Sequence, residues 1–136
     1  MERLEELIQN LDKLKYQEMY NNDFLLTWEK TDDELQAVFV VADILREMRR
    51  KNISSKIFDS GLGISLFRDN STRTRFSFVS ACNLLGLEVQ DLEEGKSQIA
   101  HGETVRETAN MISFMADVIG IRDDMYIGKG NTYMRE

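Results

Sequence analysis

From residue 60 onward, strand-like stretches alternate with helix-like ones, and this alternation restricts the possible folds more than any other feature of the chain. The strand-like stretches cover residues 61–67, 87–92 and 117–122, and the first of them is short, apolar and bounded by glycine. The stretches between them have helical spacing and cover residues 72–85 and 104–116. Gly86 is placed to close the first of these helices. We therefore expect an α/β fold, a doubly wound parallel sheet with flanking helices.

Residues 1–59 precede this alternation and are predicted to form helices that pack on the domain. Residues 2–20 place apolar side chains on one helical stripe: Leu4, Leu7, Ile8, Leu11 and Leu14. A second helix is marked by Thr31 and Glu34, which have the spacing of a capping box, and ends in basic residues. Its apolar positions are Leu35, Val38, Phe39, Ala42, Leu45 and Met48. The core of the domain is then expected over residues 60–136.

Composition excludes several classes of protein. The net charge of −7 argues against general affinity for nucleic acids. No apolar run approaches the roughly 20 residues that a membrane-spanning helix needs. The single cysteine, Cys82, cannot form an internal disulfide and fits a reducing compartment, so we expect a cytoplasmic protein. Cys82 lies on an apolar helix face and is predicted to belong to the core.

A cluster of hydroxyls and arginines follows the first predicted strand, where the next helix begins. Ser71 is placed to cap that helix, whose unpaired backbone N–H groups attract anions. Thr72 and Thr74 add hydroxyls, and Arg73 adds a planar guanidinium that matches phosphate oxygens. The cluster predicts a phosphate-binding site without the glycine-lysine pattern of nucleotide triphosphatases. The alternative is a capped helix with surface arginines.

The stretch FRDNSTRTRFSF resembles the carbamoyl phosphate motif S-T-R-T-R of the aspartate and ornithine carbamoyltransferases. A second stretch, residues 95–122, is similar to the loop, helix and arginine-ended strand of the same family. The resemblance covers about residues 60–125 and is nearest to a less characterised branch related to the knotted carbamoyltransferases. It implies the amino-terminal, carbamoyl phosphate-binding half of a two-domain transcarbamylase.

The resemblance assigns roles to individual residues. Ser71, Thr72, Arg73 and Thr74 match the run that binds the phosphate of carbamoyl phosphate. Arg73 would neutralise the leaving phosphate, and Thr74 would also reach the carbonyl oxygen. Arg75, the last residue of the motif, is expected to brace the site from within the protein.

Two further residues complete the expected site. Arg122 matches an arginine that hydrogen-bonds the carbamoyl carbonyl and stabilises the oxyanion in the transition state. Gln98 matches a loop position that enters the site of the neighbouring subunit, which implies a homotrimer. Arg73 and Arg122 would thus be the catalytic residues. No cofactor is expected, and the pair Asp123 and Asp124 is expected to be a solvated loop and not a metal site.

The family also has an H-P-x-Q segment and a second domain that binds the amine acceptor. The chain contains no proline, so that segment is absent from it, and we expect the acceptor domain to be absent too. The 136-residue piece alone is therefore expected to be inactive. The expected reaction transfers the carbamoyl group to an amine or amino acid, in amino acid metabolism. Two alternatives stay open: an ordinary ornithine or aspartate carbamoyltransferase, and a non-catalytic phosphate-binding module.

Overall fold

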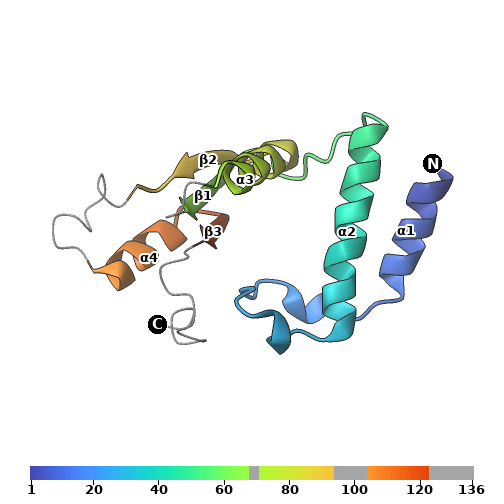
Figure 1. The fold of residues 1–136 in the computed structure, drawn as a ribbon, viewed down its shortest axis with the longest axis horizontal. Coiled ribbons are helices and arrows are strands. Elements are labelled where there is room, and N and C mark those ends of the chain that lie inside the picture. Colours follow the sequence, from blue (N-terminus) through green and yellow to red (C-terminus); the bar gives the residue numbers. More distant parts are fainter. Residues whose placement is uncertain (68–70, 94–103, 123–136) are drawn as a thin grey trace. The chain divides into compact units, whose positions relative to one another are not determined.

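A computed structural model describes residues 1–67, 71–93 and 104–122 of the chain (Figure 1). The first compact unit contains Met1–Ser55, and the second starts at Lys56. The two units are described separately below. The expected division between residues 59 and 60 falls near this boundary and stays a prediction. Among the described helices, none has the length and apolar character needed to cross a lipid bilayer.

The first unit is built on two helices, α1 (Glu2–Asp12) and α2 (Asp32–Arg50), which pack against each other. Two short 3₁₀ turns, Gln17–Met19 and Thr27–Glu29, lie in the segment that connects the helices. Apolar side chains of both helices are buried in this unit: Leu4, Leu7, Ala37 and Val40. The unit therefore forms a helical hairpin with a small core of its own.

The capping box at the start of α2 is confirmed. Thr31 Oγ1 accepts from the backbone N–H of Glu34 at 3.1 Å, and Glu34 Oε1 accepts from the backbone N–H of Thr31 at 2.8 Å.

The apolar stripes of the two helices are only partly as predicted. α1 ends at Asp12 and does not continue to residue 20, and Ile8 is exposed. Phe39 is 65% exposed because the packed face of α2 is centred on Ala37 and Val40.

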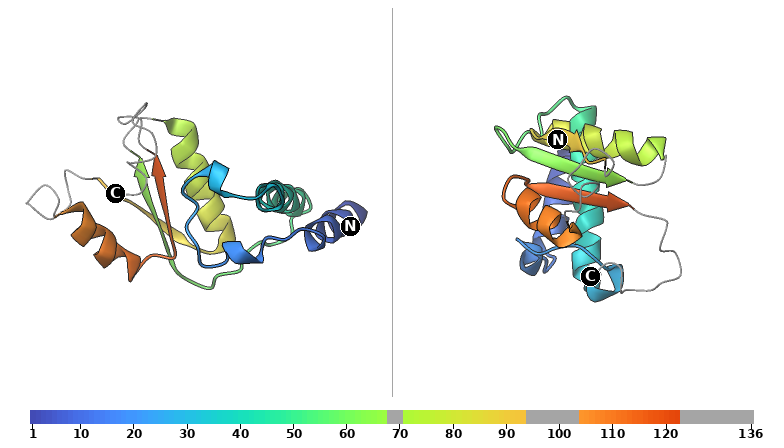
Figure 2. Two further views of the ribbon diagram at one scale, coloured as in Figure 1. Left: turned by 90° about the horizontal axis from the view of Figure 1, so that it is seen from below. Right: turned by 90° about the vertical axis from the view of Figure 1, so that its left-hand side faces the viewer.

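The second unit is a parallel three-stranded sheet with helices on both faces, as predicted. Its strands are β1 (Leu62–Phe67), β2 (Glu88–Asp91) and β3 (Val118–Arg122), in the order β2-β1-β3. The helices α3 (Thr72–Leu85) and α4 (Val105–Ser113) cover opposite faces of this sheet (Figure 2). The crossover from β1 to β2 thus runs over one face, and the crossover from β2 to β3 over the other.

Close packing holds α3 on the sheet. The rings of Phe67 in β1 and Phe78 in α3 meet edge to face, with centroids 5.6 Å apart. Gly120 in β3 lies beneath Phe78, where an added Cβ would come within 2.6 Å of the ring. Gly86 closes α3 in the left-handed region with φ of 102°, as predicted. Phe78 therefore anchors the middle of α3 on β1 and β3.

Candidate functional site

Three of the predicted site residues, Ser71, Thr74 and Arg122, lie at the carboxyl ends of β1 and β3. At this place successive connections of the chain lead to opposite sides of β1. β1 is the central strand, and the chain leaves it towards β2 through α3 and returns to β3, on its other side, through α4. Phe67, the last residue of β1, is the register partner of Arg122, the last residue of β3. Ligands of open α/β sheets bind beyond the carboxyl ends of strands at such a switch point.

Ser71 caps α3 immediately after β1. Its Oγ accepts from the backbone N–H of Thr74 at 3.4 Å and lies 2.9 Å from Thr74 Oγ1. Both side chains are half-buried. The cap therefore places two hydroxyls beside the N–H groups of the first helical turn, where the helix dipole is positive.

Arg122 reaches this helix start from the end of β3. Its Nη1 donates to Ser71 Oγ at 3.0 Å and also to Thr74 Oγ1. Arg122 therefore lies with Ser71 and Thr74 at one edge of the sheet. We refer to Ser71, Thr74 and Arg122 as the anion cradle. A guanidinium, two hydroxyls and a helix N-terminus together provide the donors and the positive potential that an anion needs.

For the other predicted residues, Thr72, Arg73 and Gln98, the described part of the chain shows no side-chain hydrogen bond to the anion cradle. Thr72 and Arg73 lie in the first turn of α3 with exposed side chains. The Arg73 side chain makes no hydrogen bond or ion pair with any residue that the structure describes. Gln98 lies within residues 94–103, outside the described residues. Ligand contacts of these three residues stay predictions.

Arg75 points away from the anion cradle and into the sheet, which agrees with the expectation that it is structural. Its Nη1 donates to Asp91 Oδ1 at 3.0 Å, and its Nη2 donates to the carbonyl oxygen of Phe67 at 2.6 Å. The guanidinium also lies 6.0 Å from the centroid of the Phe67 ring. Sequence analysis singled out neither Asp91 nor its partner Ser65. The segment of β2 also contains Glu88 and Gln90, so nothing in its sequence distinguished Asp91.

The described residues offer no metal site. No group of three or more histidine, cysteine, aspartate or glutamate side chains comes together in residues 1–67, 71–93 and 104–122. Asp123 and Asp124, which were expected to be a solvated loop, lie outside the described part of the chain.

Comparison with known families finds a match over most of the chain. The family model described as "Aspartate/ornithine carbamoyltransferase, carbamoyl-P binding domain" matches residues 22–134. The "Putative carbamoyltransferase YgeW" of Escherichia coli strain K12 is 67% identical over 136 residues, which are 100% of this chain and 34% of that protein. An ornithine carbamoyltransferase of Prochlorococcus marinus subsp. pastoris is 36% identical over 80% of this chain and 34% of its own length.

Solved structures give the same result. The ornithine carbamoyltransferase of Pyrococcus furiosus has a TM-score of 0.70 at 26% identity, over 76% of this chain and 33% of that chain. The aspartate transcarbamoylase of Trypanosoma cruzi, in complex with carbamoyl phosphate, has a TM-score of 0.70 at 20% identity, over 82% of this chain and 37% of that chain. The latter likeness concerns the fold alone. The chain thus spans about a third of the length of the curated relatives it matches.

Proposed function

This chain belongs to the aspartate/ornithine carbamoyltransferase family, and on that premise we propose that its anion cradle binds carbamoyl phosphate. The observation that carries the proposal is the contact of Arg122 with both Ser71 and Thr74. It brings the arginine at the end of β3 to the S-T-R-T-R helix start. The last residue of the second stretch that carries the family resemblance therefore lies at the first motif.

Each group of the site has a role in this proposal. The phosphate oxygens accept hydrogen bonds from the first-turn N–H groups of α3 and from the hydroxyls of Ser71, Thr72 and Thr74. Arg73 adds a fork of donors for the phosphate dianion. Arg122 donates to the carbonyl oxygen of the carbamoyl group, and Thr74 also reaches that oxygen. The ligand would thus lie with its phosphate over the helix start and its carbonyl towards β3.

The proposed reaction needs no covalent enzyme intermediate and no cofactor. An amine nitrogen attacks the carbonyl carbon, the new C–N bond forms, and negative charge develops on the carbonyl oxygen beside Arg122. The C–O bond to phosphate then breaks, and phosphate leaves with the electron pair beside Arg73. The nitrogen loses its extra proton to the departing phosphate or to solvent. The protein contributes orientation and charge stabilisation, which act more strongly in the transition state than in the ground state.

The remaining properties are proposals for the whole protein. We propose that transfer requires an acceptor-binding domain beside the core over residues 60–136, and that the 136-residue piece alone is inactive. Gln98 would enter the site of a neighbouring subunit in a homotrimer. The acceptor would be an amine or amino acid, and the protein would act in the cytoplasm, where Cys82 stays reduced.

Two other functions remain open to test. Relatives named ornithine and aspartate carbamoyltransferases share 36% and 33% identity with this chain, which favours ornithine or aspartate as candidate acceptors. A non-catalytic phosphate-binding module would keep the anion cradle and lose transfer. Phosphate release in the presence of carbamoyl phosphate and a panel of amines distinguishes these cases in the full-length protein.

Calorimetric titration of the full-length protein with carbamoyl phosphate tests the proposal directly. We expect saturable binding that weakens about tenfold or more in Arg73→Ala, because a guanidinium–phosphate contact is lost. Arg106→Ala is the matched control, since it removes an exposed arginine of α4 and should leave the affinity unchanged. If the unsubstituted protein does not bind carbamoyl phosphate, both enzyme functions are wrong.

A further inference from the structure

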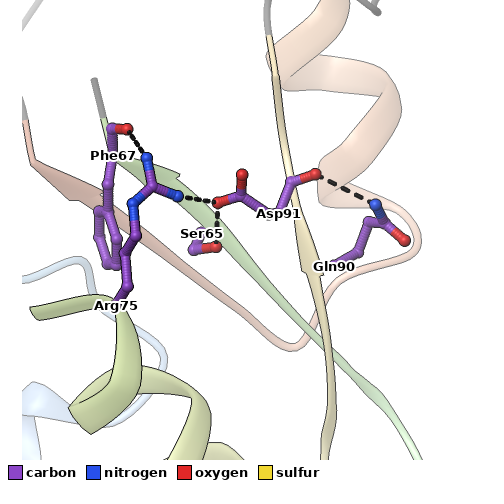
Figure 3. A network of polar contacts seen from close by, with 5 residues as sticks. All are labelled: Ser65, Phe67, Arg75, Gln90 and Asp91. Atoms are coloured by element: carbon purple, nitrogen blue, oxygen red, sulfur yellow. Dashed lines mark hydrogen bonds and ion pairs between the residues drawn. The ribbon is translucent and has the colours of Figure 1, made fainter. Parts of the chain in front are cut away.

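A network of polar contacts joins the first turn of α3 to the carboxyl ends of β1 and β2 (Figure 3). Arg75 donates to Asp91 Oδ1 at 3.0 Å and to the carbonyl oxygen of Phe67 at 2.6 Å. Ser65 Oγ donates to the same Asp91 oxygen at 2.7 Å. Asp91 thus accepts from a helix and from a strand, so two separate elements fix the orientation of its carboxylate.

The network is adjacent to the anion cradle at two points. Arg75 follows Thr74 in α3, and its backbone N–H donates to the carbonyl oxygen of Ser71 at 3.2 Å. Phe67 is the register partner of Arg122 in the sheet. A guanidinium that bonds to Phe67 therefore sets how far the helix start lies from the strand ends. The contact between Arg122 and Ser71 depends on that separation.

We propose that Asp91 is a positioning residue for ligand binding at the anion cradle. It orients Arg75, and through Arg75 it holds the first turn of α3 against the carboxyl end of β1. This inference rests on the proposed function, because the geometry that Asp91 maintains is that of the proposed phosphate site. Asp91 acts through Arg75 and not by contact with the ligand.

The exposure of the network distinguishes positioning from a general contribution to stability. The side chains of Arg75 and Asp91 are each 36% exposed, so solvent screening keeps the contribution of the ion pair to global stability small. Ser65 is only 3% exposed, and its hydroxyl is satisfied by the Asp91 carboxylate. Removal of the carboxylate charge should therefore change the local geometry of the helix start more than it changes the unfolding of the domain.

Calorimetric titrations of the full-length protein test this inference, with carbamoyl phosphate and inorganic phosphate as the probes. Asp91→Asn keeps the shape of the side chain and removes the charge that orients Arg75. Arg75→Lys keeps the positive charge and removes the second guanidinium nitrogen, Nη2, which donates to the carbonyl oxygen of Phe67. We expect both variants to bind both probes about tenfold more weakly. Glu88→Gln, which neutralises an exposed carboxylate on the same strand, should bind them normally.

Hydrogen exchange provides a readout that a merely structural role would not move. The amide of Thr74, which donates to Ser71 Oγ, should exchange faster in Asp91→Asn and Arg75→Lys. The amide of Leu87, which donates to the carbonyl oxygen of Cys82 at the other end of α3, should exchange as in the unsubstituted protein. Equal acceleration at both amides would show a general loss of stability and would overturn the inference.

The remaining outcomes separate the inference from the proposed function. Normal binding by Asp91→Asn, in a background where the unsubstituted protein binds carbamoyl phosphate, overturns the role of Asp91 alone. Absence of binding by the unsubstituted protein overturns the proposed function instead. If Asp91→Asn does not fold, Arg75→Lys decides the question by the same two readouts.

Discussion

Arg122 and Ser71 are 51 positions apart in the sequence, yet Arg122 Nη1 donates a hydrogen bond to Ser71 Oγ at 3.0 Å. The contact exists because β1 and β3 are parallel neighbours whose carboxyl ends lie at the same edge of the sheet. Ser71 follows β1, and Arg122 ends β3. A guanidinium and a helix N-terminus, both positive, are thereby held together around two hydroxyl groups.

Replacement of Arg122 by glutamine should weaken the binding of carbamoyl phosphate by the full-length protein. The substitution removes a positive charge and a charge-assisted hydrogen bond, so we expect a loss of affinity of about tenfold or more. Calorimetric titration measures the effect. Arg106→Gln, on the exposed surface of α4, serves as the charge-matched control. An unchanged affinity in Arg122→Gln would contradict a role of this residue in binding.

Replacement of Gly120 by alanine should destabilise the second unit. The added Cβ would come within 2.6 Å of the Phe78 ring, and that ring also packs edge to face on Phe67. Overpacking of this kind costs about 1–3 kcal/mol. Urea unfolding of the full-length protein, followed by circular dichroism, measures the loss.

A smaller side chain at position 78 provides the control for this prediction. Phe78→Leu removes part of the side chain that Gly120→Ala would strike, so the double variant should lose less stability than the sum of the two single losses. Additive losses would mean that the destabilisation in Gly120→Ala has a cause other than its contact with Phe78.

The thiol of Cys82 should be protected from alkylation in the folded protein. Its side chain is buried, with 5% of its surface exposed, and burial raises the pKa of the Cys82 thiol above its ordinary value of 9.0. The thiolate is the reactive form, so iodoacetamide at pH 8 should label native protein much more slowly than protein in urea. Mass spectrometry of the peptide that contains Cys82 measures the labelling.

The same pKa shift has a defined sign for stability. The folded state prefers the protonated thiol, so its contribution to folding is fully present below pH 9.0 and is lost as the pH rises through the higher pKa of the folded state. Labelling of native and unfolded protein at equal rates would show that Cys82 is accessible, and both expectations would then be wrong.

Local patterns in the sequence were sufficient for most elements of the second unit. An apolar run bounded by glycine located β1, which has Ile64 and Phe67 buried in the core. β2 and β3 contain no buried residue, and the alternation of strand and helix patterns located them. Ser71 and Gly86 marked the two ends of α3 because capping depends on residues within one helical turn. Thr104 and Glu107 form a capping box at the start of α4 and were missed, although their spacing is that of Thr31 and Glu34.

Features that depend on distant parts of the chain could not be predicted in this way. Asp91 resembles any acidic residue at the end of a strand, and its partners follow from the parallel register that places it opposite Ser65. The exposure of Phe39 follows from which face of α2 meets α1, and helical spacing alone does not decide that. Sequence analysis therefore located the chemistry of the anion cradle and missed the contacts that brace it.

The central position of β1 means that the cradle combines an earlier and a later part of the chain. Ser71 and Thr74 leave the ribosome well before β3, which supplies Arg122 and closes the sheet on the other side of β1. A nascent chain that ends before residue 122 can cap α3 but cannot hold an anion from both sides. Because a ligand stabilises whichever state it binds, carbamoyl phosphate at the cradle would also strengthen the pairing of β1 with β3. The proposed substrate would then favour the late step of folding that creates its own site.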